Sequence, residues 1–450
     1  MNNSNKIMYF LGIGGIGMSA LARWYKQQGA IIFGYDIQRS QLTEELINEG
    51  MTIHFESDIN QIPENISIAI YTPAIPSQNI ELIYLKNLGV PILKRAEIIG
   101  RLTSDFFTIA IAGTHGKTSI SSLTAHLLKN SGIYVTAFVG GICKNYNSNL
   151  ILSKSTEYMV VEADEYDRSL LQIKPNIAVI SSIDEDHLDI YKDYEDLKST
   201  FEQFVKKLPP EGVLIHNSKL GSFDSIDAKN VTYGIKNDAS LFASNIHIAD
   251  GKFIIDIDTE IGKMENVEVQ IPGFHNIENT LAATAIAIEI GLSLKNIRTG
   301  IITFKGVERR MDFRIDNGKT IFIDDYAHHP EEIKATISAV KKLYPNKKLT
   351  GIFQPHLFSR TRDFAIEFAA ELSQLDELIL MDIYPAREEP IEDITSHTIL
   401  NQTTNKKGQI MSKEEILEYL FKNQPEVLVT MGAGDIGLLA NEIETQLLMN

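Results

Sequence analysis

The chain has 450 residues, of which 44% are hydrophobic and 22% are charged. This composition is typical of soluble globular proteins, and the length predicts about three domains. The net charge of −17 argues against nucleic acid as a partner, because binding to a phosphate backbone needs a basic face. The single cysteine, Cys143, excludes a disulfide framework. No signal peptide or membrane-spanning stretch is recognisable, which predicts a cytoplasmic protein without membrane insertion.

The first hundred residues alternate between short apolar runs and helical patterns. Strands are expected at 7–11, 31–36 and 67–72, with a helix at 18–28. This alternation predicts an open α/β sheet. Gly12, Gly14 and Gly17 satisfy GxGxxG after the first strand, and Asp36 ends the next strand, where a dinucleotide's ribose would bind. Taken alone, the pattern predicts NAD.

A second glycine turn follows the apolar run 106–112 and precedes a helical pattern that ends near Gly132. Its sequence, GTHGKTS, places Lys117 and Thr118 at the start of the helix. Backbone N–H groups there attract phosphate oxygens, Lys117 adds a positive charge, and Thr118 offers a hydroxyl to magnesium. Ile111 stands where the strict P-loop has a glycine. The alternative is a simple βα turn, but adjacent Gly, Lys and Thr favour nucleotide binding.

Acidic residues follow the next two predicted strands. Strand 158–161 runs into Glu162, which we predict to hold magnesium because it lies at a strand end beside the phosphate loop. For Asp164 and Glu165, metal binding and helix capping are equally supported. Strand 177–181 runs into a cluster of Asp184, Asp186, His187 and Asp189. His187 is either part of a second metal site or a bystander.

Residues 212–272 look rich in strands, with a turn at Asp250-Gly251, and a helix is expected to run from the GFHNIEN stretch to Glu289. Asn276 and Asn279 at its start either cap the helix or read an adenine or a ribose. The pair Arg309 and Arg310 either clamps phosphate or forms a solvated linker, and on these residues alone the linker interpretation is favoured.

From residue 313 the strand–helix pattern restarts with a hairpin around Asn317-Gly318. Polar residues follow two of its strands, and the basic ones among them indicate either a site for carboxylate or phosphate or ordinary loop polarity. These are Asp324, Asp325, His328, His329, His356, Arg360 and Arg362. A second GxGxxG, at Gly432, Gly434 and Gly437, shows that this pattern occurs twice in one chain and is therefore weak evidence for a dinucleotide.

Taken together, these motifs resemble those of the Mur ligases over essentially the whole chain. The stretches that carry the resemblance are GIGGIGMSALA (12–22), AGTHGKTS (112–119), EADEYDRS (162–169), DEDHLDIY (184–191), GFHNIEN (273–279), ERRMDF (308–313), DDYAHHPEE (324–332) and QPHLFSRTRD (354–363). The resemblance implies an α/β protein of three domains: a Rossmann-like domain at 1–104 that binds a UDP-sugar rather than NAD, a central ATPase domain at 105–312 with a mostly parallel sheet and a β-rich portion, and a Rossmann-like domain at 313–450 that binds an amino acid.

The activity that the resemblance implies is ATP-dependent joining of L-alanine to the lactyl carboxylate of UDP-N-acetylmuramate, through an acyl phosphate, in peptidoglycan precursor synthesis. The cofactors are ATP with Mg²⁺, or Mn²⁺ in its place, and a monomer or weak dimer is expected. Magnesium would be held by Thr118, Glu162 and His187. Lys117, His187, His328 and Arg360 would be catalytic.

The resemblance also implies two sets of ligand-binding residues. ATP would be bound by Gly113, Thr114, His115, Gly116, Lys117, Thr118, Ser119, Asn276, Asn279, Arg309 or Arg310, and Asp324 or Asp325. The sugar nucleotide and amino acid would be bound by Gly12, Gly14, Gly15, Gly17, Asp36, His115, Tyr326, His328, His356 and Arg360.

Three positions depart from the usual family pattern. Leu357 and Phe358 replace an arginine and a tyrosine, which removes a positive charge near the amino-acid end. Arg168 is an added charge. Phe201 occupies the position at which sister ligases carry a carbamylated lysine, so we predict no carbamate. The competing functions are a ligase that recycles murein tripeptide onto the same sugar nucleotide, an NAD-dependent oxidoreductase, and a non-catalytic nucleotide-binding regulator.

Overall fold

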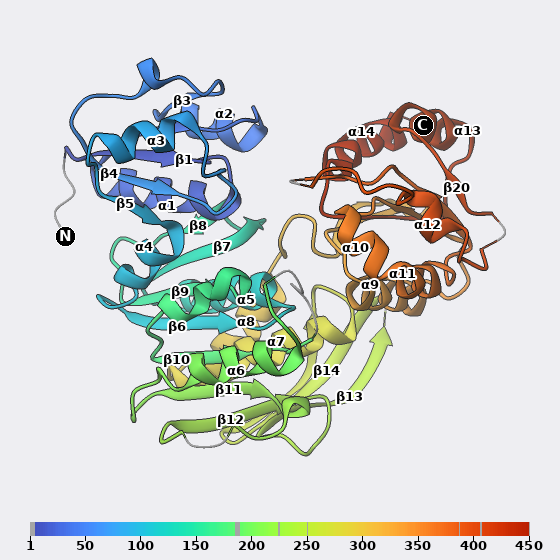
Figure 1. Ribbon diagram of the computed structural model, residues 1–450. Coiled ribbons are helices and arrows are strands. Elements are labelled where there is room, and N and C mark those ends of the chain that lie inside the picture. The colour runs from blue at the N-terminus through green and yellow to red at the C-terminus, as the bar shows by residue number, and fades with distance from the viewer. Residues whose placement is uncertain are drawn as a thin grey trace. The chain divides into compact units, whose positions relative to one another are not determined.

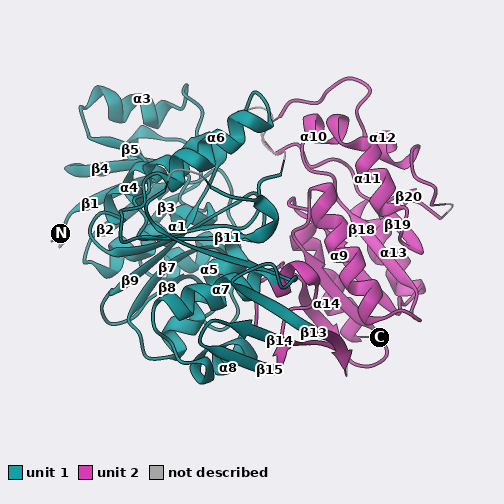
Figure 2. Cartoon of the chain, turned by 90° about the horizontal axis from the view of Figure 1, so that it is seen from below, with its two compact units in different colours: residues 1–244, 257–264, 278–304 teal, residues 245–256, 265–277, 305–450 magenta. Residues whose placement is uncertain are grey.

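The computed structural model describes residues 5–184, 190–223, 226–249, 251–386, 388–405 and 407–449. These residues form three β-sheets with helices between their strands (Figure 1). The chain separates into two compact units, one of residues 1–244, 257–264 and 278–304 and the other of residues 245–256, 265–277 and 305–450 (Figure 2). Within the described ranges, no helix is long and apolar enough to cross a bilayer.

The N-terminal sheet has five parallel strands in the order β3-β2-β1-β4-β5. Its central strand β1 has the sequence IMYFL and is almost wholly buried, as expected for a strand covered on both faces. The open α/β sheet predicted from sequence is confirmed. The strands are β1 (Ile7–Leu11), β2 (Ile31–Tyr35), β3 (Thr52–His54), β4 (Ile66–Tyr71) and β5 (Ile92–Lys94), and the helices are α1 (Ile16–Gln27), α2 (Gln41–Asn48), η1 (Ile59–Gln61), α3 (Ile80–Asn87) and α4 (Arg95–Leu102).

The second sheet has ten strands in the order β15-β14-β13-β12-β11-β10-β6-β9-β7-β8. The strands around the phosphate loop are parallel, whereas β7 and β8 form an antiparallel hairpin. The strands are β6 (Phe107–Ala112), β7 (Val135–Cys143), β8 (Ser148–Ile151), β9 (Tyr158–Ala163), β10 (Ile177–Ile180), β11 (Val213–Asn217), β12 (Lys229–Gly234), β13 (Leu241–Ala249), β14 (Lys252–Thr259) and β15 (Gly262–Val269). The helices are α5 (Lys117–Asn130), η2 (Tyr166–Gln172), α6 (Tyr194–Val205), η3 (Ser218–Leu220), α7 (Phe274–Glu289) and α8 (Leu294–Thr303).

The third sheet has six strands in the order β16-β17-β21-β18-β19-β20. The predicted hairpin is confirmed, because β16 and β17 pair antiparallel, and the other neighbours are parallel. The strands are β16 (Asp312–Asp316), β17 (Ile321–Asp325), β18 (Leu349–Phe353), β19 (Glu377–Leu380), β20 (Gln409–Ile410) and β21 (Val427–Met431), and the helices are α9 (Pro330–Leu343), α10 (Phe358–Asp363), α11 (Ala365–Leu372), α12 (Ser396–Leu400), α13 (Lys413–Lys422) and α14 (Ile436–Met449).

Separate buried apolar clusters hold these layers together. In the first unit a single apolar cluster joins residues of the N-terminal sheet to residues of the second sheet, and the rings of Trp24 and Phe138 lie 6.5 Å apart in it. In the second unit the sheet has a separate cluster on each face. Ile321 and Ile323 belong to one cluster and Phe322 to the other, because successive side chains of a strand point to opposite faces.

Candidate functional site

The N-terminal glycine loop leads into α1 and includes the first residues of this helix. Gly14 N–H donates to Asp36 Oδ2 at 2.7 Å, so this carboxylate is bonded to the loop's own backbone. A Cβ at Gly17 would lie 2.5 Å from Arg95 Nη1, which shows how closely the guanidinium approaches the first turn of the helix. A helix N-terminus beside a guanidinium favours an anion such as a diphosphate. Arg95 was not recognised from sequence, although it directly follows a strand, as site residues in α/β proteins often do.

The phosphate loop joins β6 to α5, and its two glycines have left-handed backbone angles. Gly113 has φ of +129° and Gly116, which caps α5, has φ of +85°. A Cβ at Gly113 would lie 2.1 Å from Ser181 Oγ, so no side chain fits there. The segment after β10 supports the loop: His115 N–H donates to Ser182 Oγ at 2.9 Å. The two serines of this segment were not anticipated, because the contact spans more than sixty residues of chain.

Lys117 makes an ion pair with Glu165 inside this loop. Its ammonium donates to the two carboxylate oxygens at 2.7 and 2.9 Å and to the Gly113 carbonyl at 2.7 Å. Burial alone would lower the pKa of Lys117, but the neighbouring carboxylates, Glu165 foremost, outweigh it and raise the pKa above its usual value. Lys117 therefore stays positively charged. For Glu165, where metal binding and capping were equally supported, the geometry indicates a third role as counter-ion of the lysine.

Glu162 lies near the end of β9 and faces the first turn of α5. Its Oε1 accepts from Ser121 Oγ at 3.0 Å and from Gly140 N–H at 2.6 Å, and its Oε2 accepts from Thr118 Oγ1 at 3.2 Å. A Cβ at Gly140 would lie 2.6 Å from Glu162 Oε2, so the glycine keeps the carboxylate accessible. A hydroxyl and a carboxylate are oxygen donors of the kind that Mg²⁺ prefers. His187, the third predicted ligand, lies outside the described residues.

His115 and Asn279 lie at the same loop. His115 Nε2 is 3.5 Å from Asp184 Oδ2, and Asn279 approaches Gly116 so closely that a Cβ there would lie 2.5 Å from Asn279 Oδ1. The structure therefore brings these two predicted residues to the phosphate loop. Asn276, in the other unit, is buried and donates to the Pro272 carbonyl at 2.8 Å.

In the second unit, the two predicted aspartates are bonded internally. Asp324 accepts from Arg309 Nε at 3.2 Å and from Thr430 Oγ1 at 2.7 Å, and it is fully buried. Asp325 accepts from two backbone N–H groups, those of Met311 and Ala327, both at 2.8 Å. Burial raises the pKa of Asp325 to about 6. These contacts indicate that both carboxylates brace the strand end.

Some of the predicted basic and aromatic residues of the second unit lie next to one another in a row, whereas His329 contacts the Phe364 ring and Arg362 pairs with Asp363. The guanidinium carbons of Arg309 and Arg310 lie 5.2 and 4.9 Å from the Tyr326 ring centroid. The next rings along the row are those of His328 and His356, whose centroids are 6.0 Å apart. His356 in turn stacks on Tyr384, a residue that sequence analysis missed, at 5.8 Å. The arrangement combines positive charge with aromatic faces.

The departures from the family pattern have distinct environments. Leu357 is buried with φ of +70°, a strained conformation for a leucine, and precedes the helix that carries Arg360. Arg168 donates to Thr200 Oγ1 at 2.8 Å and to Asp196 Oδ2 at 2.7 Å, so it is tied to α6. Phe201 on the same helix is fully buried in the core of the first unit.

Comparison with known proteins covers the whole chain. Sequence models match at residues 7–107 (Mur ligase family, catalytic domain), 111–287 (Mur ligase middle domain) and 309–434 (Mur ligase, glutamate ligase domain). The UDP-N-acetylmuramate–L-alanine ligase of Flavobacterium psychrophilum is 47% identical over 99% of both chains, and that of Porphyromonas gingivalis (strain ATCC 33277) is 44% identical over 98% of this chain and 99% of its own.

Solved structures agree with these relatives. The UDP-N-acetylmuramate–alanine ligase of Thermotoga maritima superposes with a TM-score of 0.83 at 26% identity and covers 99% of both chains. A murein peptide ligase of Psychrobacter arcticus shares the fold, with a TM-score of 0.73 at 22% identity over 98% of this chain and 99% of its own. The similarity is full-length and spans all three domain models. The chain belongs to the Mur ligase family.

Proposed function

We propose that this chain is an ATP-dependent ligase that joins L-alanine to UDP-N-acetylmuramate in peptidoglycan precursor synthesis. The observation that carries the proposal is its 43–47% identity, over the full chain, to relatives named UDP-N-acetylmuramate–L-alanine ligase. The murein tripeptide ligase is the second candidate, but the murein peptide ligase of Psychrobacter arcticus is only 22% identical. We place the reaction in the cytoplasm, where ATP is available.

The reaction has two steps. The lactyl carboxylate attacks the γ-phosphorus of ATP, and ADP leaves, which gives an acyl phosphate. The amine of L-alanine then attacks the acyl carbon, loses a proton, and expels inorganic phosphate from the tetrahedral intermediate. Because a carboxylate must approach an anionic phosphate, the protein has to neutralise charge at this point. Lys117 suits this task, since its neighbours hold it in the charged form.

A divalent cation fits the corner formed by Thr118 and Glu162. The hydroxyl and carboxylate oxygens already face one another at 3.2 Å beside Gly140. We propose that these residues, together with His187, hold Mg²⁺, with Mn²⁺ as a substitute. When bound, the ion would neutralise the charge of the γ-phosphate.

We assign each unit's remaining residues by their contacts. The glycine loop at 12–17 with Arg95 would hold the diphosphate of the sugar nucleotide, and residues 1–104 would form that domain. Residues 105–312 would bind ATP through the phosphate loop and Asn279. Residues 313–450 would bind L-alanine through Tyr326, His328, His356 and Arg360. We assign Arg310 to the phosphates, because the Arg309 guanidinium is bonded to Asp324 and to the Gly432 carbonyl.

The test is a coupled assay of phosphate release. Purified protein is incubated with ATP, Mg²⁺, L-alanine and UDP-N-acetylmuramate, and phosphate and the ligated product are measured together. We expect release only when both acceptor substrates are present, and none with Lys117→Ala. Faster release with murein tripeptide than with alanine would favour the recycling ligase. NADH binding without substrate-dependent release would favour the oxidoreductase.

A further inference from the structure

Asn149, in the hairpin formed by β7 and β8, contacts the N-terminal glycine loop. Its Nδ2 donates to the Ile16 carbonyl at 2.6 Å and to Ser19 Oγ at 2.8 Å, and its Oδ1 accepts from Arg23 Nη1 at 2.6 Å. The Asn149 side chain has no exposed surface. Donor and acceptor ends of the amide are therefore both used, and both are directed at the first two turns of α1.

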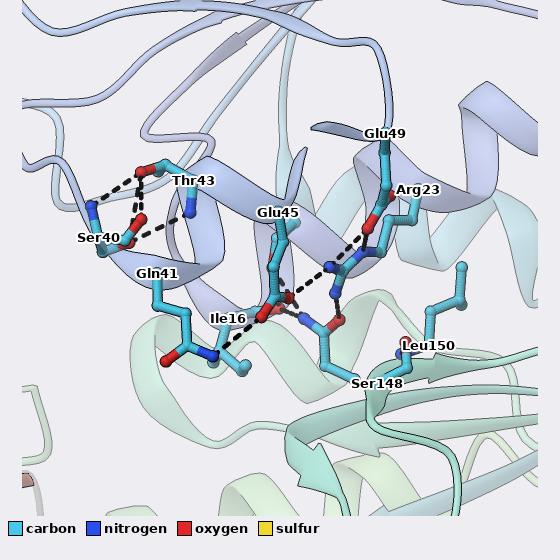
Figure 3. Close-up of polar contacts among 11 residues, drawn as sticks. Ile16, Arg23, Ser40, Gln41, Thr43, Glu45, Glu49, Ser148 and Leu150 are labelled. Atoms are coloured by element: carbon cyan, nitrogen blue, oxygen red, sulfur yellow. Dashed lines mark hydrogen bonds and ion pairs between the residues drawn. The ribbon is translucent and has the colours of Figure 1, made fainter. Parts of the chain in front are cut away.

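The contact belongs to a polar network that is buried at Asn149 and Arg23. Arg23 is 8% exposed, and it donates from Nε to Glu49 at 2.9 Å and from Nη2 to Glu45 at 3.0 Å. Figure 3 shows the Arg23 side chain reaching Glu45 of α2 and Glu49, which directly follows α2, close to the strand segment with Ser148 and Leu150. Asn149 and Arg23 are buried, whereas the side chains of Glu45 and Glu49 are 36% and 38% exposed. A shift of the buried pair would leave its polar groups unpaired, which favours one arrangement.

The same hairpin also reaches the ATP-binding side. Gly140 on β7 donates its N–H to Glu162 Oε1 at 2.6 Å, and Glu162 accepts from Thr118 at the start of α5. The hairpin lies beside α1 in the fold (Figure 1), where Trp24 packs near Phe138 of β7. One short element is therefore bonded both to the glycine loop and to the predicted metal ligand.

We propose that Asn149 is a positioning residue that sets the sugar-nucleotide loop relative to the phosphate loop. This inference rests on the proposed function, in which the lactyl carboxylate must meet the γ-phosphate in line. Misplacement of a reacting group by about 1 Å is enough to cost about a hundredfold in rate. Asn149 fixes the position of the Ile16 carbonyl within the glycine loop. The hairpin that carries Asn149 is also bonded to Glu162, so it links the position of the glycine loop to that of Glu162.

The test compares Asn149→Ala with Ser148→Ala, a neighbouring variant on β8 whose hydroxyl accepts from Leu150 N–H. We expect Asn149→Ala to raise the KM for UDP-N-acetylmuramate about tenfold, the equivalent of one hydrogen bond, and to lower kcat. The KM values for ATP and L-alanine should stay near those of the wild type. Ser148→Ala should leave all of them unchanged.

A second readout does not depend on turnover. Hydrogen exchange of the backbone amides in residues 12–19 should accelerate in Asn149→Ala, whereas exchange in residues 113–119 should not. Ser19→Ala, which removes one acceptor, should show the same change to a smaller degree and serves if Asn149→Ala does not fold. Equal rises in all three KM values, or unchanged exchange at 12–19, would overturn the inference. A wild type without substrate-dependent phosphate release would instead refute the proposed function, and the exchange data would still decide the role of Asn149.

Discussion

Lys117 Nζ lies 2.7 and 2.9 Å from the two carboxylate oxygens of Glu165, and the Glu165 side chain is only 1% exposed. The charge of the loop lysine is thus already paired with a carboxylate of its own unit. In the proposed function, an incoming triphosphate would share the lysine with this carboxylate. The pair therefore stabilises the loop before nucleotide binds and weakens the attraction that the loop exerts on phosphate.

Glu165→Gln should separate these two effects. It leaves Lys117 as an incompletely compensated buried charge, so we expect the free energy of unfolding to fall by about 2 kcal/mol. ATP should bind several-fold more tightly, because its phosphates replace the missing negative charge. Urea unfolding and calorimetric titration with ATP measure the two quantities.

Asp164→Asn is the matched control for Glu165→Gln. It removes the same charge from the same loop, and Asp164 also raises the pKa of Lys117, but its side chain accepts from Tyr166 N–H. It should change ATP affinity much less. If Glu165→Gln weakened ATP binding as strongly as Lys117→Ala, Glu165 would be a nucleotide contact and not a counter-ion.

Tyr191 contacts the backbone of Glu165. Its hydroxyl donates to the Glu165 carbonyl at 2.6 Å, and the Arg168 guanidinium carbon lies 5.0 Å from its ring centroid. Tyr191→Phe should lower the free energy of unfolding by about 1 kcal/mol, the value of one hydrogen bond, and raise the KM for ATP several-fold without changing that for UDP-N-acetylmuramate. Steady-state kinetics with each substrate varied in turn would show this.

Arg168→Ala should reproduce part of the Tyr191→Phe effect, because it releases the ring from the other side. Lys94→Ala is its control: Lys94 pairs with the adjacent Asp167 at 2.7 Å, but both side chains are about 40% exposed. We expect that variant to leave the KM for ATP unchanged. A Lys94→Ala effect as large as that of Arg168→Ala would mean that the whole η2 segment, and not the Tyr191 stack, sets the loop.

Glu162→Gln should abolish metal-dependent turnover while the affinity for UDP-N-acetylmuramate stays nearly constant. The substitution keeps the contacts to Ser121 and Gly140 but removes the negative charge that a divalent cation requires. Phosphate release is measured while Mg²⁺ or Mn²⁺ is titrated, and the affinity for the sugar nucleotide is measured directly. These two measurements test the expected loss of turnover and the expected constant affinity. A parallel fall in sugar-nucleotide affinity would contradict the assignment of ligands to domains.

His126 predicts a pH dependence of stability. It lies on α5, hydrogen-bonded to Tyr146 and Thr303, and burial lowers its pKa to about 4. The unfolded chain, with a pKa near 6.5, takes up a proton first as the pH falls. The contribution of His126 to the free energy of unfolding is therefore fully present above about pH 6.5. It is lost as the pH falls to 4, which lowers the free energy of unfolding by on the order of 3 kcal/mol.

Urea unfolding of His126→Gln between pH 4 and 8 checks this prediction. The substitution should lower the free energy of unfolding at pH 7.5, and it should lower it less, or not at all, at pH 5. His247→Gln, at an exposed histidine on β13, should show no such change of slope. An equal difference from the wild type at every pH would show that His126 does not take part in the transition.

The sequence predicted the elements that local patterns encode. The glycine turn between β6 and α5, the hairpin β16–β17 and the end of α7 at Glu289 follow from periodicity and turn residues, and the structure confirms them. Contacts between distant residues were not predictable. Asn149 bonds a carbonyl 133 residues earlier, and no pattern around it marks a buried amide. Asp36 had the position of a ribose ligand, yet its carboxylate accepts from Gly14 N–H.

The identity of residue 201 decides whether carbon dioxide has to react with the protein at this position. Phe201 is fully buried, and the resemblance to the sister ligases predicts that they carry a lysine at this position, whose amine captures carbon dioxide. With no amine there, that position cannot require dissolved bicarbonate to become competent. The Phe201 side chain is packed in the apolar core as soon as the chain has folded, and this packing does not depend on the supply of carbon dioxide in the cell.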